Sequence, residues 1–525
     1  MTESNDSPAH SGYMKRLMQG TALAAVNFFV ILALSFWLVP IQIHTLGERL
    51  NGIWQTVAVL TGWFALMDFG LSFTVSRFVT KSFSTRDYDE CNQYASTGLG
   101  LFLMFGGVVF VLSLLFGFGA SYCFPEVEDI GLIGTVLFLS GAAFALDFPL
   151  RAFTGISIGT MRHDLVGLAS IVTRIGSAVI TYLILVNGGK LIALALGNIV
   201  FMLVQIAAYY MIARHSFPQL NLSRKNLRRS HVRSLFHYSV FGFIAQIGNM
   251  FIFQINKLVI PIMFAFEYVT PFNIAITFAD QFRNLLLAMT NWMVTWLTYL
   301  HTQGLKDELL KTMRFGFKLC TCLSGFITFG LIAWCEPFIT RWMLTPEKIE
   351  AGKINLEFWQ DIVPCVILMA LAAAVRSVFE PNVRYLYATA KHHYYAISTV
   401  IEGLLNVNLS IFFALQWGLV GFAWGTLIAS VVMRGIVLPV IVCRLMERNI
   451  IAFYCEMLWL LLPVGVALIV PAFVTQLLVA PNYPSLFLVG GISAATYFPV
   501  IYLIGFSAEE RRKIHGYIFP NGKGS

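Results

Sequence analysis

The chain has 525 residues, of which 58% are hydrophobic and only 12% are charged, and its mean hydropathy is +0.74. Soluble domains carry about 25% charged residues, so this composition excludes a soluble enzyme. The aromatic content of 14% excludes a disordered chain, and 8 Cys are too sparse for a disulfide-stapled secreted domain. We therefore expect a membrane protein that crosses the bilayer many times.

Apolar runs of the length needed to cross a bilayer recur along the whole chain. A hydrocarbon core of about 30 Å requires about 20 apolar residues in a helix, and this criterion predicts an all-α polytopic membrane protein with about 14 transmembrane helices. In chain order the predicted spans are 20–43, 52–79, 94–117, 130–153, 165–186, 191–213, 236–264, 269–300, 315–334, 362–379, 394–415, 418–443, 451–475 and 485–505.

The loops between these spans predict the orientation. With an even number of spans, both termini lie on one side, and most of the 35 Lys and Arg residues fall on that side. Because Lys and Arg are enriched in cytoplasmic loops, both termini are predicted to be cytoplasmic. Loop bias and attraction to anionic membrane lipids account for the net charge of +8, so no nucleic-acid partner is expected.

One cytoplasmic segment, 214–235, is rich in Arg and Lys and contains no acid, and we interpret it as a basic linker lying on lipid headgroups. A weak internal repeat supports a division at this linker, because Thr160 to His163 before the fifth span resembles Thr389 to His392 before the eleventh. Copies separated by six spans run in the same direction, which predicts two six-helix lobes related by a pseudo-two-fold axis along the membrane normal. The predicted parts are a tail at 1–19, an N-lobe at 20–213, the linker at 214–235, a C-lobe at 236–445, two further helices at 446–506 and a tail at 507–525.

Residues 46–47, 51–55, 60–72 and 77–79 read LG, NGIWQ, LTGWFALMDFGLS and RFV. This region resembles the second-helix region of bacterial oligosaccharide and polysaccharide flippases of the O-antigen type. Their superfamily also holds the multidrug and toxic-compound extruders and the peptidoglycan lipid flippases. The resemblance implies two lobes around a central cavity, alternating access, and export of a polyprenyl-diphosphate-linked oligosaccharide across the bacterial inner membrane. It also implies glycosyltransferases or a glycan polymerase as partners, and we expect a monomer.

Charged residues inside the spans are the candidate site, because each costs at least about 2.5 kcal/mol at the bilayer centre and so faces a cavity or a partner. Arginine forms paired bonds to phosphate oxygens, so intramembrane cations would suit a diphosphate. The candidate substrate-binding cations are Lys257, Arg283, Arg174 and Arg376, and Arg434 is a further intramembrane cation without an assigned role.

Polar residues recur on single helical faces. Asn273, Thr277, Asp280, Asn284 and Asn291 form one stripe in the eighth predicted span, for which a cavity wall is the favoured interpretation. The candidate cavity or coupling residues are Asp68, Asp280, Asn284, Asn273, Asn256 and Glu402.

Structural roles for the intramembrane polar groups remain open. Polar side chains also hold neighbouring helices together, and Asp68 could equally cap or pair with a helix. Asp147 with Arg151 and Arg376 with Glu380 are expected to be ion pairs, because each pair is four residues apart.

Three function classes are consistent with the composition. The first is the flippase, driven by an ion gradient or the membrane potential; the second is a drug or metabolite antiporter of the same superfamily. The third is a polyprenyl-dependent membrane glycosyltransferase or polymerase, which would ordinarily need a large outer loop with catalytic carboxylates. No such loop is evident, so we expect no enzyme activity and no catalytic residues. The cysteines are scattered, and the one close pair, Cys320 and Cys322, lacks His or carboxylate neighbours at ligand spacing, so no metal site is expected, and we expect no cofactor.

Overall fold

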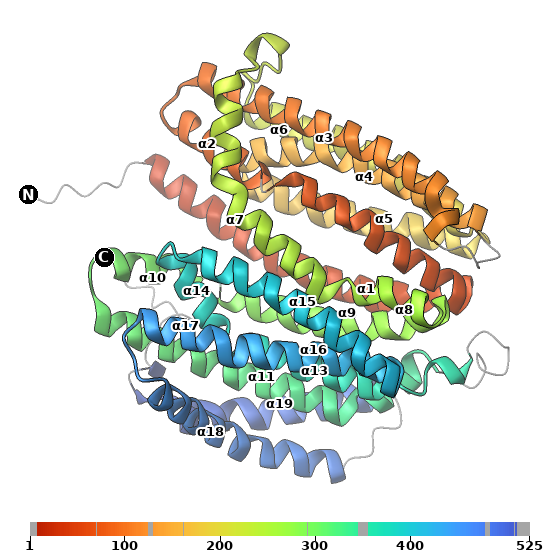
Figure 1. Cartoon of the computed structure of the whole chain (residues 1–525). Coiled ribbons are helices and arrows are strands. Elements are labelled where there is room, and N and C mark those ends of the chain that lie inside the picture. The colour runs from red at the N-terminus through yellow and green to blue at the C-terminus, as the bar shows by residue number, and fades with distance from the viewer. Residues whose placement is uncertain are drawn as a thin grey trace, which may run out of the picture. The chain divides into compact units, whose positions relative to one another are not determined.

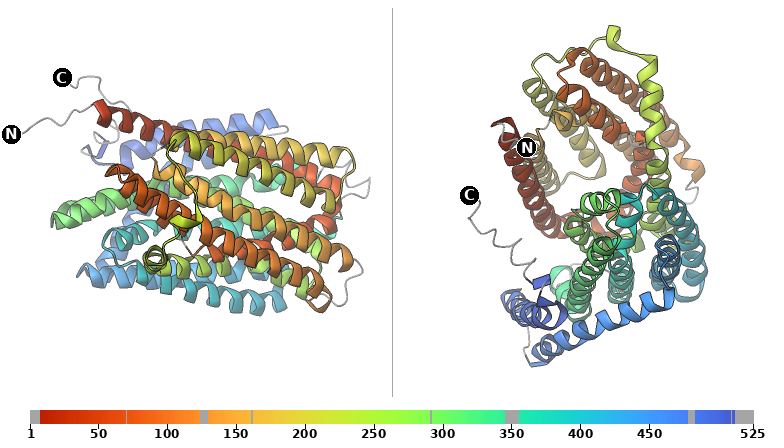
Figure 2. Two further views of the ribbon diagram at one scale, coloured as in Figure 1. Left: turned by 90° about the horizontal axis from the view of Figure 1, so that it is seen from above. Right: turned by 90° about the vertical axis from the view of Figure 1, so that its left-hand side faces the viewer.

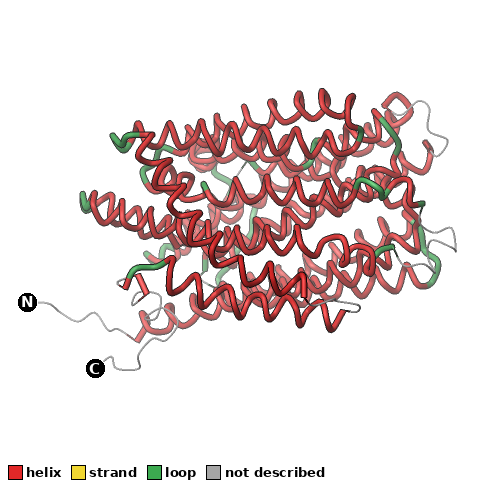
Figure 3. Tube along the Cα trace, turned by 90° about the horizontal axis from the view of Figure 1, so that it is seen from below, coloured by secondary structure: helices red, strands yellow, loops and turns green. Residues whose placement is uncertain are grey.

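The computed structural model describes residues 8–69, 71–123, 130–160, 162–290, 292–344, 355–477, 483–508 and 510–511. Within these ranges the chain forms helices joined by short loops, and no strand is present (Figure 3). Helices satisfy every backbone hydrogen bond internally, which is the requirement for crossing a hydrocarbon layer. The predicted all-helical, multi-pass membrane fold is confirmed.

Eleven stretches of the described residues are long and apolar enough to span a membrane. Most coincide with predicted spans, such as Asp164–Val186 and Leu191–Ser216. The difference from the expected 14 amounts to three spans. The first two predicted spans fall within the one stretch Phe29–Asp68, although Gly47 breaks the helix there, and the seventh is divided between α7 and α8. The eighth contains residue 291, which lies outside the described residues.

Contacts divide the chain into two compact units, Met1–Ile247 with Lys257–Thr270, and Gly248–Asn256 with Pro271–Ser525. In the first unit α4 packs on α2, α3 and α6, and α5 packs on α1 and α6 (Figure 1). The elements that lie in it wholly or mainly are α1 (Pro8–Gly62), η1 (Trp63–Asp68), α2 (Leu71–Ser84), α3 (Tyr88–Cys123), α4 (Ile130–Gly159), α5 (His163–Val186), α6 (Leu191–Ser216), η2 (Arg224–Asn226), α7 (Arg229–Phe253) and α8 (Asn256–Met263).

In the second unit α16 packs on α13 and α15, and α11 packs on α13 and α18. Helices α18 and α19 pack on each other and on α11, along one edge of this unit (Figures 1 and 2). Its elements are α9 (Phe266–Thr290), α10 (Trp292–Thr302), α11 (Lys306–Trp342), η3 (Leu356–Phe358), α13 (Ile362–Val378), α14 (Glu380–Ala388), α15 (His392–Trp417), α16 (Leu419–Ser430), η4 (Val431–Val437), α17 (Leu438–Leu445), α18 (Ile450–Leu477) and α19 (Tyr483–Gly505).

The second predicted span, 52–79, is not one helix. Gly47 interrupts α1 with φ 78° and ψ 169°, a conformation that glycine adopts without a Cβ penalty. Downstream, the short 3₁₀ helix η1 ends at Asp68, and the next residue, Phe69, is left-handed at φ 47°. The Asp68 carboxylate accepts hydrogen bonds from the Ser72 backbone N–H at 3.3 Å and hydroxyl at 2.8 Å. These bonds cap a new helix, α2, instead of extending the old one.

The two repeat segments begin equivalent helices. α5 starts at His163 after Arg162, and α15 starts at His392 after Lys391. The sequence match therefore marks two helix starts, one in each unit.

Large apolar side chains on the span-forming helices face outward. Phe118 is 78% exposed, Trp459 71% and Phe487 70%. In water such exposure would be unfavourable, whereas in a bilayer these groups contact acyl chains.

The predicted basic linker is held against α3. Asn92 donates from Nδ2 to the Gln219 carbonyl at 3.1 Å and accepts at Oδ1 from the Asn221 N–H at 2.8 Å. The His231 ring lies 4.0 Å from the Tyr94 ring, measured between centroids. The cations of this segment remain exposed; they are Arg214, Arg224, Lys225, Arg228, Arg229 and Arg233.

Candidate functional site

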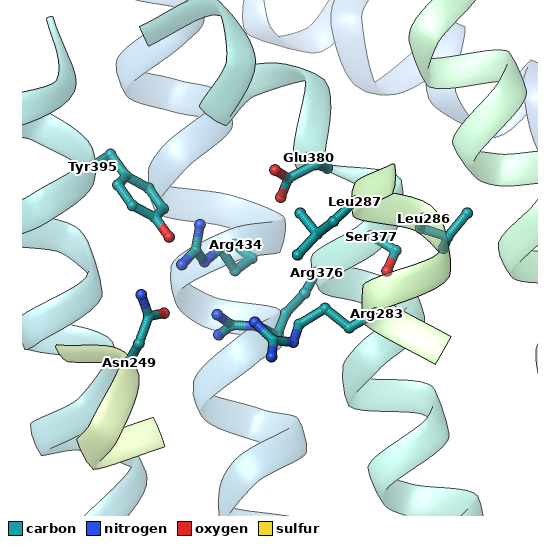
Figure 4. Close-up of a pocket in the computed structure, with 9 residues that line it drawn as sticks. All are labelled: Asn249, Arg283, Leu286, Leu287, Arg376, Ser377, Glu380, Tyr395 and Arg434. Carbon is teal, nitrogen blue, oxygen red and sulfur yellow. The ribbon is translucent and has the colours of Figure 1, made fainter. Parts of the chain in front are cut away.

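A cavity of about 200 Å³ lies within the second unit (Figure 4). It contains more basic than acidic groups, which suits an anionic ligand. Its lining residues are Asn249, Arg283, Leu286, Leu287, Arg376, Ser377, Glu380, Tyr395 and Arg434.

Close packing of α7 on α15 forms one wall of this cavity. A Cβ on Gly248 would lie 2.6 Å from the Thr399 backbone carbon, so only glycine allows this approach. Beyond it α7 ends at Phe253, and Asn406 of α15 donates to the carbonyls of Phe251 and Ile252, both at 3.2 Å. These bonds satisfy carbonyls that a helix end leaves unpaired.

Glu402 of α15 joins two arginines from different elements. Its Oε1 pairs with Nη1 of Arg376 on α13, and its Oε2 pairs with Nε of Arg434 on η4 at 2.8 Å. Arg434 also donates to Thr399 Oγ1 at 3.2 Å. All three charged groups are buried, with 7%, 3% and 1% exposure for Arg376, Arg434 and Glu402. One carboxylate therefore faces two guanidinium groups, which leaves one positive charge uncompensated.

Arg434 occupies an unusual stretch of backbone. η4 is a π-helix between α16 and α17, and such insertions alter which side chains face the helix's neighbours. The Arg434 guanidinium carbon lies 4.8 Å from the centre of the Tyr395 ring, which contributes a cation–π contact.

Two further ion pairs surround this group. Arg283 pairs with Asp280 at 3.3 Å on α9, and Arg384 pairs with Glu380 at 3.0 Å on α14. The expected pair of Arg376 with Glu380 is wrong, because Arg376 pairs with Glu402 instead. α13 ends at Val378 and α14 begins at Glu380, so the continuous helical register assumed for a four-residue spacing is lost.

The arginines retain unused hydrogen-bond donors. Nε of Arg283 and Nε of Arg376 are buried and have no hydrogen-bond partner among the described residues. Both guanidinium groups lie against the ring of Phe253, at 4.4 and 4.6 Å from its centre. Buried donors without acceptors are costly, so these two Nε groups raise the free energy of the site as it stands.

The candidate cations divide between the units. Arg283 and Arg376 line the cavity, whereas Arg174 is exposed on α5 of the first unit. Lys257 is 8% exposed on α8, and its backbone carbonyl accepts a bond from Thr56 Oγ1 at 3.5 Å. A substrate-binding role for Lys257 and Arg174 stays a prediction.

Asp68 has structural contacts in the first unit. Besides capping α2, it lies 3.6 Å from Nη1 of Arg151. The expected pair of Asp147 with Arg151 is confirmed, at 2.6 Å. The structure thus contains the capping and pairing contacts considered for Asp68, and its part in coupling stays a prediction.

The polar candidates of the second unit differ in their surroundings. Asn256 is 2% exposed and donates to Thr426 Oγ1 at 3.2 Å. On α9, the Asn273 backbone carbonyl accepts from Thr277 at 2.8 Å, and Asn284 is exposed. Asn291, the last member of the predicted stripe, lies outside the described residues.

Arg434 and Tyr395 were not among the predicted site residues. The signal for Arg434 was present, since it is an arginine within an apolar run. Its partner Glu402 lies 32 residues away on another helix, and no sequence periodicity connects positions on separate helices.

A family model described as polysaccharide biosynthesis protein matches residues 17–296, which is more than half of the chain. The uncharacterized membrane protein EpsK of Bacillus subtilis (strain 168) is 20% identical over 436 residues, covering 80% of this chain and 81% of EpsK.

Among solved structures, the lipid II flippase MurJ in an inward closed conformation has a TM-score of 0.69 at 16% identity, covering 92% of this chain and 98% of that one. An inward-facing multidrug resistance transporter of the MATE family has a TM-score of 0.66 at 13% identity, covering 83% and 99%. These structures have the same fold as this chain. The family match together with this transporter fold identifies the chain as a multi-pass membrane protein that belongs to the polysaccharide biosynthesis protein family.

Proposed function

We propose that this protein is a flippase that moves a polyprenyl-diphosphate-linked oligosaccharide from the cytoplasmic to the outer leaflet. The observation that carries the proposal is the cavity lined by Arg283, Arg376 and Arg434, whose three guanidinium groups outnumber its one lining carboxylate. A diphosphate has the charge and the acceptors that these groups require. The family of the chain supports a glycan as the rest of the substrate.

The size of the cavity supports the headgroup as its occupant. Pockets that enclose whole drug-sized ligands have about 300–1,000 Å³. A cavity of about 200 Å³ suits the compact diphosphate, with the glycan and the lipid outside it.

Transport would proceed by alternating access of two six-helix lobes, at 20–213 and 236–445, with the helices at 446–506 added to the second. The lobes would be related by a pseudo-two-fold axis along the membrane normal, and both termini would be cytoplasmic in a bacterial inner membrane. An ion gradient or the membrane potential would drive export, with Asp68, Asp280 and Glu402 as the candidate coupling carboxylates. No catalytic step is part of this proposal.

Gene deletion followed by mass analysis of lipid-linked intermediates tests the proposal. The expected result is accumulation of a complete diphospholipid oligosaccharide on the cytoplasmic side, restored to normal by the native gene. Arg283→Ala should fail to restore export at matched expression, whereas Lys311→Ala should succeed, because Lys311 is an exposed cation paired with Glu308 outside the cavity. Absence of an elongated product in the deletion strain would instead point to an enzyme and refute the flippase.

A further inference from the structure

The two arginines with unused Nε donors meet at one aromatic ring. Arg283 comes from α9, Arg376 from α13, and Phe253 from the last turn of α7. Their distances to the ring centre limit the separation of the two guanidinium carbons to about 9 Å. In Figure 4 both guanidinium groups point toward the same part of the pocket.

Two like charges this close repel each other, and their arrangement therefore needs a physical cause. The face of an aromatic ring carries partial negative charge and attracts each guanidinium. Asp280 compensates Arg283, while Arg376 shares Glu402 with Arg434. The ring thus holds together two cations that the nearby carboxylates do not fully neutralise.

Phe253 itself is held firmly. The carbonyls of the two preceding residues accept bonds from Asn406, and the Gly248 turn of α7 lies directly against the α15 backbone. These contacts fix the backbone that carries the Phe253 ring, and the two guanidinium groups packed against that ring are therefore arranged before a ligand binds.

We infer that Phe253 is a positioning residue that makes the cavity select a headgroup with two linked phosphates over one with a single phosphate. The inference rests on the proposed function and specifies that the cavity recognises the second phosphate of the headgroup. A diphosphate offers acceptors to Arg283 and Arg376 together, whereas a single phosphate has fewer acceptors to share between them. Without the ring, the two arginines separate and the advantage of the second phosphate is lost.

The test measures binding of inorganic pyrophosphate and inorganic phosphate to the purified full-length protein in detergent, by calorimetry at fixed salt. The native protein should bind pyrophosphate at least tenfold more tightly than phosphate. Phe253→Leu should reduce the ratio of pyrophosphate affinity to phosphate affinity to less than about threefold, mainly by weakening the binding of pyrophosphate. Phe253→Tyr keeps the aromatic face and should therefore keep the native affinity ratio.

Phe278→Leu is the matched control, because Phe278 packs on Phe338 and Trp342 in the same unit and does not line the cavity. This variant should keep the native ratio. An unchanged ratio in folded Phe253→Leu, with tight pyrophosphate binding, would overturn this inference alone. Should Phe253→Leu fail to fold, a Phe253→Tyr ratio below threefold would overturn it equally. No pyrophosphate binding by the native protein would remove the diphosphate site and the proposed function with it.

Discussion

Replacing Arg434 with Gln removes one of the two partners of a buried carboxylate. Glu402 is 1% exposed and, among the residues that the structure describes, would keep only Arg376 and a 3.4 Å contact from the Ser430 hydroxyl. Removing one member of a buried ion pair costs about 3–5 kcal/mol, because the other charge stays buried without it. Since Arg376 still compensates Glu402, we expect the lower end, about 3 kcal/mol.

The assay is thermal unfolding of the purified protein in detergent at one scan rate, because membrane proteins of this size commonly unfold irreversibly. An unfolding entropy of about 2.1 cal/mol/K per residue gives about 1 °C per kcal/mol for 525 residues, so Arg434→Gln should lower the apparent Tm by about 3 °C. Arg434→Lys keeps the charge but loses the planar fork, and its Tm should lie between those of the native protein and the Gln variant.

Arg174→Gln is the control, because Arg174 lies in a predicted span and is exposed on α5. Exposed substitutions usually change stability by less than about 0.5 kcal/mol. Equal Tm values for the Arg434 and Arg174 variants would refute the reasoning, because the buried triad would then contribute nothing to stability.

Two further predictions concern the first unit. A Cβ at Gly52 would lie 1.9 Å from the Phe266 carbonyl oxygen, so Gly52→Ala should destabilise the protein by about 1–3 kcal/mol. Gly62 on the same helix has open space around its Cβ position, so Gly62→Ala should not destabilise it. Thermal scans of both variants test this, and equal losses of stability would contradict the close packing at Gly52. Burial lowers the pKa of His231 below its ordinary 6.5, so the fold favours the neutral ring, and stability should be complete above pH 6.5 and fall as the pH drops below it. The difference in Tm between unfolding scans at pH 8 and pH 5.5 should be smaller for His231→Gln than for the native protein. An equal difference in Tm would contradict the assignment of this pH dependence to His231.

Hydropathy predicted most of the fold, because the length and polarity of a span are local properties of the sequence. It did not predict the interruption at residues 63–69, where Asp68 caps a second helix. It also did not predict the division of 236–264 into α7 and α8. Capping and helix breaks depend on side-chain hydrogen bonds that an average over some 20 residues conceals.

The candidate site was predicted residue by residue and not as an arrangement. Arg283, Arg376 and Glu402 could be found because each is a charge inside an apolar run. Their partners could not, because Glu402 contacts residues 26 and 32 positions away, on separate helices. Phe253 gave no signal in a chain with 46 Phe, since its role comes only from the two arginines placed against it.

The most direct test of the central claim is transport by the purified protein in liposomes. A fluorescent polyprenyl-diphosphate-linked oligosaccharide is placed in both leaflets, and a membrane-impermeant quencher reports how much of it reaches the outer leaflet. Native protein should expose nearly all of the label to the quencher, and Arg283→Ala should leave about half protected. Half protection with the native protein, or full exposure with Arg283→Ala at equal incorporation, would contradict the account.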